Sequence, residues 1–169
     1  ELHVKGGHIV GTDWIVIKTA TGGFIDGAPT GCLLLLDAHS GEPRWLLDDH
    51  GWLTQQRTAA AGALATLTFS RPDSRTALII GTGGLARAII HAHQAVAPHL
   101  RLEVWGRDPH RASELASELG VARAENLSDA VKTADVIVTA TNSRTPLFDA
   151  EWVQPETHIT ALAADTVGK

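Results

Sequence analysis

The 169-residue sequence has one cysteine and no long run of apolar residues. With Cys32 alone the chain cannot form an internal disulfide, and such low cysteine usage fits a reducing compartment. No stretch approaches the ~18 consecutive apolar residues of a transmembrane helix, and the first residues, ELHVK, do not resemble a secretory signal. We therefore expect a cytoplasmic protein that neither crosses nor binds a membrane.

Metal-binding and nucleic-acid-binding signals are also missing. The chain has nine histidines but no HExxH or CxxC spacing. His91 and His93 lie two residues apart on an expected helix and so do not face one site. The net charge is −5 and the basic residues are scattered rather than clustered. We expect no metal ion and no nucleic acid as a ligand.

Methionine is absent even at position 1, and the sequence begins within a strand-like stretch. These two features indicate an internal piece of a longer protein, so any activity is expected to depend on the rest of that protein. The piece itself is 44% hydrophobic, which suffices for a sizeable core.

The most informative stretch is TALIIGTGGLARA, residues 76–88. It predicts a strand over 77–80, a tight turn, and a helix that runs to about Pro98. Gly81 allows the sharp turn, Gly83 lets the backbone approach a pyrophosphate, and Ala86 permits close packing of the helix on the strand. Free N–H groups at the helix start would meet the phosphates. The expected cofactor-binding residues of this turn are Gly81, Thr82, Gly83, Gly84, Leu85 and Ala86.

The chain before this stretch is β-rich. Strand-like runs bounded by Gly, Asp and Pro occupy 2–5, 8–10, 14–18, 32–36 and 44–47, with Gly6–Gly7 between the first two and a turn at 37–41. An alanine-rich helix follows, with Thr54 as its expected N-cap. The breaker stretch 70–74 then sets the domain boundary, giving a partial β-rich domain over 1–70 and a second domain over 71–169.

Strands and helices alternate after residue 71. Strands are expected at 77–80, 102–105, 121–124, 136–139 and 158–162, with helices at 110–119, ending at Gly120, and at 128–133, capped by Ser128. This alternation predicts the α/β class, namely a Rossmann-type, doubly wound parallel sheet preceded by the β-rich region. In that context the glycine-rich turn predicts a dinucleotide site.

The end of the second strand of this domain bears on the type of cofactor. An NAD site usually has Asp or Glu there to bind the ribose 2′-hydroxyl, but this chain has Gly106 followed by Arg107. Arginine can bind a 2′-phosphate, so NADP(H) is favoured. The alternative is that Arg107 is an ordinary loop residue and Asp108 binds the ribose of NAD(H).

Three cations outside the glycine-rich turn are candidate substrate ligands. Lys18 precedes a small-residue loop, 19–23, which could open onto a cleft, and Lys5 adjoins Gly6–Gly7. Arg57 lies in the expected first turn of the alanine-rich helix, and arginine binds carboxylates through two parallel hydrogen bonds. From spacing alone, each of the three is better explained as a solvated surface residue.

Six blocks in order along the chain resemble the ornithine cyclodeaminase and mu-crystallin family: HVKGGHIVGTDWIVIKTATGGF, GWLTQQRTAAAGALA, GTGGLARA, VWGR, ADVIVTATNSRTPLF and HITALAADTVGK. The resemblance covers essentially all 169 residues. It implies that segments before Glu1 and after Lys169 complete a substrate and dimerisation domain, and that the whole protein is a homodimer.

The resemblance also assigns roles to individual residues. Arg57 and Lys18 match residues that bind the substrate carboxylate, with Lys5 a weaker member of the set, and Asp165 matches the catalytic aspartate. The loop Thr139-Ala140-Thr141 resembles the one beside the nicotinamide ribose.

Three positions depart from the family pattern. Leu85 stands where glutamine is usual, Ala163 where glycine is usual, and Val167 where proline is usual. Leu85 would remove a polar contact near the cofactor, and Val167 would loosen the turn that carries Asp165.

The implied activity is hydride transfer at the α-carbon of an amino or cyclic imino acid. An NADP(H)-dependent reductase of pyrroline- or piperideine-2-carboxylate is the leading expectation, with Asp165 as the proton donor. Ornithine cyclodeaminase and an alanine-dehydrogenase-like enzyme are the alternatives that use the same residues. An NADPH-binding protein without turnover is an alternative of another class.

Overall fold

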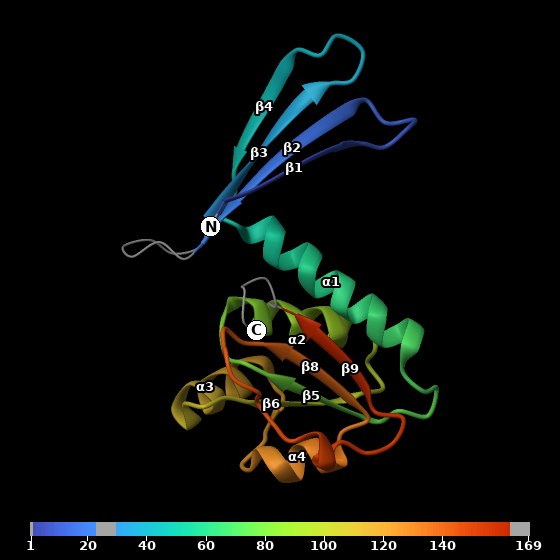
Figure 1. Ribbon diagram of the computed structural model, residues 1–169, viewed down its shortest axis with the longest axis vertical. Coiled ribbons are helices and arrows are strands. Elements are labelled where there is room, and N and C mark those ends of the chain that lie inside the picture. The colour runs from blue at the N-terminus through green and yellow to red at the C-terminus, as the bar shows by residue number, and fades with distance from the viewer. Residues whose placement is uncertain (1, 23–29, 163–169) are drawn as a thin grey trace. The chain divides into compact units, whose positions relative to one another are not determined.

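The computed structural model describes residues 2–22 and 30–162, and the chain divides into two compact units, Glu1–Gln55 and Gln56–Lys169. The helix α1, Trp52–Phe69, begins in the first unit and lies mostly in the second (Figure 1). The sequence placed the domain boundary after residue 70 and assigned this whole helix to the first domain.

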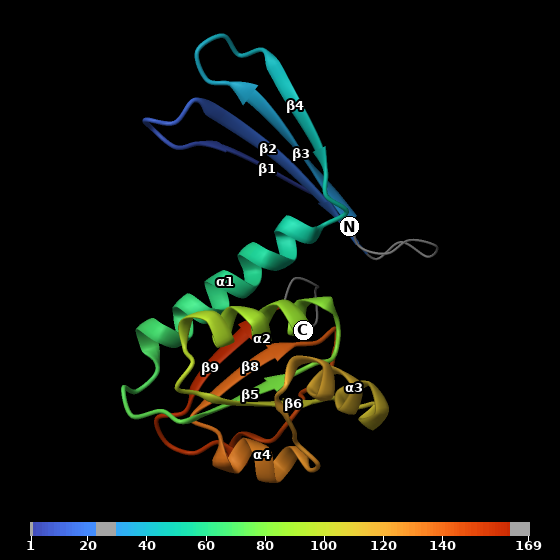
Figure 2. The same ribbon diagram turned by 180° about the vertical axis from the view of Figure 1, so that it is seen from behind.

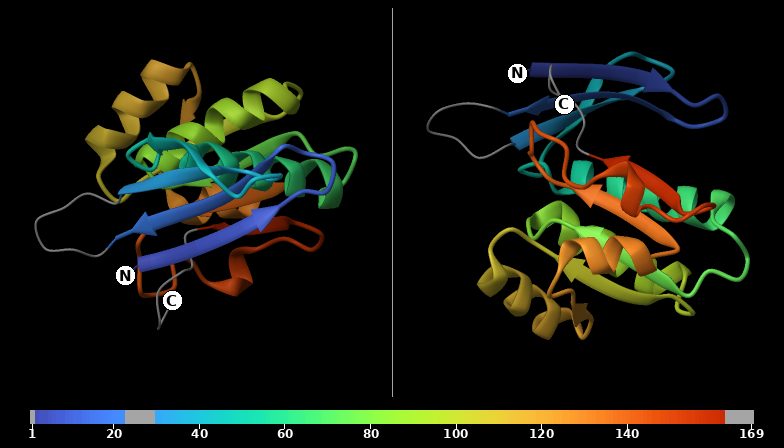
Figure 3. Two further views of the ribbon diagram at one scale, coloured as in Figure 1. Left: turned by 90° about the horizontal axis from the view of Figure 1, so that it is seen from above. Right: turned by 60° about the horizontal axis from the view of Figure 1, so that its bottom comes forward.

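The first unit is a four-stranded antiparallel sheet. Its strands are β1 Leu2–His8, β2 Trp14–Thr21, β3 Thr30–Asp37 and β4 Pro43–Asp48. Their order in the sheet follows the chain, as the blue-to-teal ribbons of Figure 3 show, so the expected β-rich region is a meander of antiparallel hairpins. The expected turn at 37–41 is also present, because the Asp37 carboxylate accepts hydrogen bonds from the backbone N–H groups of His39 and Ser40 at 2.9 and 3.0 Å.

Two local expectations in this unit were wrong. Gly6–Gly7 does not separate two strands, because β1 runs through both glycines in continuous register with β2. The chain turns instead at Gly11, whose φ of 88° is left-handed, beside Thr12, whose hydroxyl donates to the Ile9 carbonyl at 2.7 Å. Likewise Thr19–Thr21 is not a loop but the end of β2, paired with β3.

The helix α1 begins at Trp52, three residues earlier than expected, so Thr54 is not its N-cap. The Asp49 carboxylate accepts hydrogen bonds from the backbone N–H groups of Gly51 and Leu53, at 3.3 and 2.6 Å. An aspartate just ahead of a helix satisfies N–H groups that lack helical partners. Arg57 is consequently in the second turn of α1 rather than the first.

The second unit contains a five-stranded parallel sheet in the order β7-β6-β5-β8-β9, which confirms the predicted α/β class. Its strands are β5 Thr76–Ile80, β6 Arg101–Trp105, β7 Ala122–Arg123, β8 Val136–Ala140 and β9 His158–Leu162. The connecting helices are α2 Gly84–Val96, α3 Pro109–Leu119 and α4 Leu127–Thr133, with a 3-10 turn, η1, at Ala150–Trp152.

Both faces of the parallel sheet are covered by helices. Along β5, Ala77 and Ile79 pack in a core cluster with α2, while Leu78 and Ile80 pack in a second cluster with α4. Successive strand residues point to opposite faces, so a fully apolar strand is what a doubly wound sheet requires. Figures 1 and 2 show α2 on one side of the sheet and α4 on the other.

Capping residues define the helix ends of this unit. Gly120 ends α3 in the left-handed conformation, with φ at 65°, as expected. Ser128 is not the cap of α4, because the Asn126 side chain accepts from the N–H groups of Ser128 and Asp129. None of the helices in the described ranges is long and apolar enough to cross a membrane.

Candidate functional site

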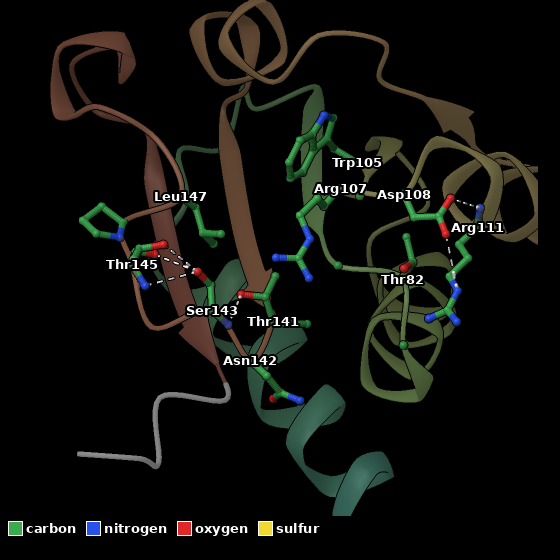
Figure 4. A pocket seen from close by; sticks show the side chains of 15 residues that line it. Thr82, Trp105, Arg107, Asp108, Arg111, Thr141, Asn142, Ser143, Thr145 and Leu147 are labelled. Atoms are coloured by element: carbon green, nitrogen blue, oxygen red, sulfur yellow. Dashed lines mark hydrogen bonds and ion pairs between the residues drawn. The ribbon is translucent and has the colours of Figure 1, made fainter. Parts of the chain in front are cut away.

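A pocket of about 480 Å³ lies at the carboxyl ends of β5, β6 and β8 (Figure 4). The chain leaves β5 toward β6 on one side of the sheet and later returns to β8 on the other. The crevice between oppositely directed crossovers is where open parallel sheets bind their ligands. The lining residues come from the ends of these strands, the loops that follow them and the first turn of α3: Gly81, Thr82, Gly83, Trp105, Gly106, Arg107, Asp108, Arg111, Ala140, Thr141, Asn142, Ser143, Thr145, Pro146 and Leu147.

Gly81 makes the first turn out of β5. Its φ of 138° is a conformation that side chains rarely adopt, and a Cβ there would lie 2.4 Å from the carbonyl oxygen of Ala140. Its N–H donates to the Trp105 carbonyl at 2.9 Å. Gly81 therefore ties the ends of all three strands together at the base of the pocket.

Gly83 lies at the start of α2, where the surroundings are open rather than crowded as they are at Gly81. A Cβ on Gly83 would meet nothing within 4 Å, so the fold does not require glycine there. Gly83 is the N-cap of α2 and provides no side-chain hydrogen bond to the N–H groups of the first turn. Those groups and the helix dipole suit an anion, and the missing side chain leaves room for it.

Gly106 follows the last residue of β6 and packs against the glycine-rich turn. A Cβ on Gly106 would lie 2.4 Å from Cγ2 of Thr82 and 3.6 Å from Cβ of Ala112. An acidic residue at 106, where many NAD sites have one, would have to displace Thr82. The local packing therefore disfavours that arrangement.

Two arginines and one aspartate follow Gly106. Asp108 caps α3, and one of its carboxylate oxygens accepts from the N–H groups of His110 and Arg111 at 3.0 and 3.3 Å. Its other oxygen lies 3.6 Å from Nε of Arg111. Arg107 is exposed and has no hydrogen-bond or ion-pair partner within residues 2–22 and 30–162.

The loop after β8 forms the opposite wall. Oγ1 of Thr141 accepts from the Ser143 N–H at 3.3 Å, and the Ser143 hydroxyl donates to the Thr145 carbonyl at 2.8 Å. Leu147 belongs to the loop and also packs on the core cluster beneath the sheet. These hydrogen bonds hold the conformation of the loop, and none of them uses the Asn142 side chain.

The structure gathers most, but not all, of the residues expected to bind the cofactor. Seven of them line the pocket: Gly81, Thr82, Gly83, Gly106, Arg107, Ala140 and Thr141. Gly84, Leu85, Ala86 and Thr139 do not. Ala86 is fully buried in the core, and Leu85 is partly buried against the same cluster.

Several lining residues were not anticipated from the sequence. Trp105 and Arg111 are the most notable, because one is aromatic and the other charged. The pair Asp108-Pro109 is a standard helix start, with Asp as the cap and Pro at the first helical position. That signal could have placed Arg111 in the first turn of α3 and hence at this edge of the sheet.

The residues assigned to the substrate lie outside this pocket. Lys5 and Lys18 are directly opposite each other on β1 and β2 of the first unit, and Arg57 is exposed on α1 in the second unit. Asp165, together with Ala163 and Val167, lies outside the described residues. No cluster of metal-ligating side chains occurs in the part of the chain that the structure describes.

The pocket satisfies the main requirements of a dinucleotide. The space left open at Gly83 admits a pyrophosphate against the start of α2, and Arg107 supplies a free cation at the end of β6. Trp105 and Leu147 supply apolar surface near the same loops. The residues present therefore fit a nicotinamide dinucleotide.

Comparison with known proteins agrees with this geometry. Residues 10–169 match the model of the ornithine cyclodeaminase/mu-crystallin family. A putative dehydrogenase of Rhizobium meliloti is 39% identical over 100% of this chain and 55% of its own length. The Δ1-pyrroline-2-carboxylate reductase of Paracoccus denitrificans is 35% identical over 82% of this chain and 46% of its own length.

Two solved structures have the same fold. The iminosuccinate reductase of Paracoccus denitrificans, in complex with NAD⁺, has a TM-score of 0.84 at 27% identity and covers 98% of this chain and 54% of its own. A lysine cyclodeaminase has a TM-score of 0.80 at 30% identity, over 100% and 56%. This chain thus spans about half the length of the relatives it matches. The chain belongs to the ornithine cyclodeaminase/mu-crystallin family.

Proposed function

We propose that the protein containing this chain is an NADP(H)-dependent reductase of a cyclic imino acid such as Δ1-pyrroline-2-carboxylate. The observation that carries the cofactor assignment is the end of β6, where an acid in place of Gly106 would collide with Thr82 and Arg107 is an unpaired cation in the described part of the chain. The reaction class is supported by the Paracoccus reductase, which is 35% identical.

Each proposed residue has one task. A bound NADPH supplies a hydride to the imine carbon. Asp165 gives a proton to the ring nitrogen, so the C=N bond becomes C–N and the products are proline and NADP⁺. Arg57 and Lys18 hold the substrate carboxylate, with Lys5 beside Lys18, and so orient the imine carbon.

The direct test uses the complete protein with NADPH and Δ1-pyrroline-2-carboxylate, followed by nicotinamide absorbance. We expect consumption of NADPH and formation of proline. An ornithine cyclodeaminase is the second candidate, favoured by the 30% identity to lysine cyclodeaminase. Proline formed from ornithine with catalytic NAD⁺, without consumption of NADPH by the imine, would establish it instead.

Two other outcomes remain distinguishable. Interconversion of alanine and pyruvate with ammonia would point to an alanine-dehydrogenase-like enzyme. Tight NADPH binding without turnover of any of these substrates would leave a binding protein. We also propose that the whole protein is a homodimer, which size-exclusion chromatography with light scattering would test.

A separate variant tests the preference for NADPH over NADH. Arg107→Asp should lower the affinity for NADPH and raise the relative affinity for NADH, because it replaces a cation beside the 2′-phosphate with an anion. The ratio of the two dissociation constants is the measurement. An unchanged ratio would show that Arg107 does not bind the 2′-phosphate.

A further inference from the structure

Arg111 is a charged residue of the pocket that the proposed function leaves unused. It lies in the first turn of α3, where the helix dipole disfavours a cation. The helix dipole therefore gives no reason for an arginine there. Arg111 lines the same pocket as Arg107, and this position gives the arginine a possible role in binding a ligand.

The contacts of Arg111 leave most of its guanidinium available. Only Nε lies near a carboxylate, at 3.6 Å from Asp108, and the two terminal amino groups have no partner in the described ranges. The side chains of Arg111 and Asp108 are 73% and 55% exposed, so this ion pair is weak. An anion can therefore compete with Asp108 for Arg111 without breaking any buried ion pair or hydrogen bond.

Thr82 lies between the two arginines in the close-up view, and all three side chains line the pocket (Figure 4). The absence of a side chain at Gly106 is what lets Thr82 take this place. Two guanidinium groups and one hydroxyl are suitable donors for a phosphate monoester. Asp108 is the only acid lining the pocket in the described residues, so the local charge is net positive.

We propose that Arg111, with Arg107 and the hydroxyl of Thr82, binds the 2′-phosphate of NADP(H), and that Asp108 positions Arg111 rather than binding the ribose. This inference rests on the proposed NADP(H) dependence and adds the second cation that such a site needs. One carboxylate oxygen of Asp108 already accepts two hydrogen bonds from the start of α3, and the other lies 3.6 Å from Nε of Arg111.

The test measures binding of adenosine 2′,5′-bisphosphate and of 5′-AMP to the complete protein by calorimetry. Arg111→Ala should weaken the bisphosphate by about tenfold or more, as expected for a lost charge-assisted hydrogen bond, and should change 5′-AMP by less than about twofold. The matched control is Arg101→Ala, which removes an exposed arginine at the other end of β6. It should alter neither constant.

A second variant examines Asp108 without disturbing the helix start. Asp108→Asn retains a capping oxygen and removes the charge. If Asp108 does not bind the ribose, 5′-AMP should bind to Asp108→Asn as tightly as to the wild type. A loss of 5′-AMP and NAD⁺ affinity would mean that Asp108 binds the ribose and would overturn the assignment.

The remaining outcomes separate this inference from the proposed reaction. If Arg111→Ala weakens the bisphosphate no more than Arg101→Ala does, or weakens both nucleotides equally, Arg111 is not a ligand of the 2′-phosphate. If the predicted losses occur but no imino acid is reduced, the phosphate site stands and the proposed reaction fails. Adenosine 3′,5′-bisphosphate should bind more weakly than the 2′,5′ isomer, and equal affinity would mean a nonspecific anion site and overturn the inference.

Discussion

Gly81 and Gly83 occupy the same turn but are glycines for different reasons. A methyl group at Gly81 would meet the Ala140 carbonyl at 2.4 Å in a left-handed conformation, so Gly81→Ala should strain the turn itself. We expect it to lower the melting temperature and to weaken NADPH binding by more than about tenfold. Thermal unfolding and calorimetry on the whole protein would measure both effects.

Gly83→Ala is the matched variant, because nothing lies within 4 Å of the added methyl. Its melting temperature should stay close to that of the wild type, whereas NADPH affinity should fall as the methyl enters the space of the pyrophosphate. If Gly83→Ala binds NADPH as well as the wild type does, the phosphates do not lie against the start of α2.

Asp165 can be tested although it lies beyond the described residues. Asp165→Asn keeps the size of the side chain but removes its ability to exchange a proton. The turnover rate should fall by about 10²-fold or more, while NADPH binding stays unchanged. A rate within a few-fold of the wild type would show that another group is the proton donor.

For individual residues, the sequence predicted the glycine-rich turn well but the other residues around the pocket less well. At Gly81 and Gly106 a Cβ would lie 2.4 Å from a neighbouring atom, so the structure itself requires glycine there, whereas at Gly83 only the proposed pyrophosphate requires it. Arg111 and Trp105 were missed because their importance depends on which loops the sheet order brings together. Leu85 was expected near the cofactor, but the turn of α2 directs it onto the core.

Among the elements, the packing of α1 on α2 depends on a fully buried histidine. Nδ1 of His93 donates to the Ile89 carbonyl at 2.8 Å, so the neutral ring accepts at Nε2 from the Thr66 hydroxyl, at 3.0 Å. Burial lowers the pKa of His93, because the charged ring would lose its hydration.

This contact predicts a pH-dependent stability. The pKa of His93 in the unfolded chain is about 6.5, so its contribution is present in full above about pH 6.5 and is lost as the pH falls toward the lower folded pKa. Each unit between the two pKa values corresponds to about 1.4 kcal/mol in the free energy of unfolding. Urea unfolding at about pH 7.5 and about pH 5 should show that loss.

The exposed neighbour His91 supplies the control. His91→Gln should lose stability between the two pH values as the wild type does. His93→Gln cannot become charged, so it should lose clearly less. If all three proteins lose the same amount, His93 is not the source of the effect.

Element boundaries show why sequence patterns predict helices better than their caps. The expected strands and helices of the second unit all occur, because their apolar residues repeat at the period that two-sided burial requires. The starts of α1 and α4 were misplaced because several residues near each start can cap a helix. Asp49 and Asn126, rather than Thr54 and Ser128, do so once the preceding loops have set their positions.

For the whole molecule, the order β7-β6-β5-β8-β9 is what turns three separate sequence segments into one pocket. The sequence predicted a doubly wound sheet but not the order of the strands within it. Two of the residues proposed to bind the substrate, Lys5 and Lys18, belong to the antiparallel sheet, whereas the pocket lies in the second unit. That separation predicts that variants of the two units will have separable effects.

Lys18→Ala should therefore raise the KM for Δ1-pyrroline-2-carboxylate by about tenfold or more, because it removes a cation from the substrate carboxylate. Its affinity for NADPH should match that of the wild type, whereas Gly83→Ala should show the reverse pattern. Lys132→Ala removes an exposed lysine of α4 and should change neither value. If Lys18→Ala weakens NADPH and leaves the substrate KM unchanged, the lysine serves the cofactor, and the proposed division between the two units is wrong.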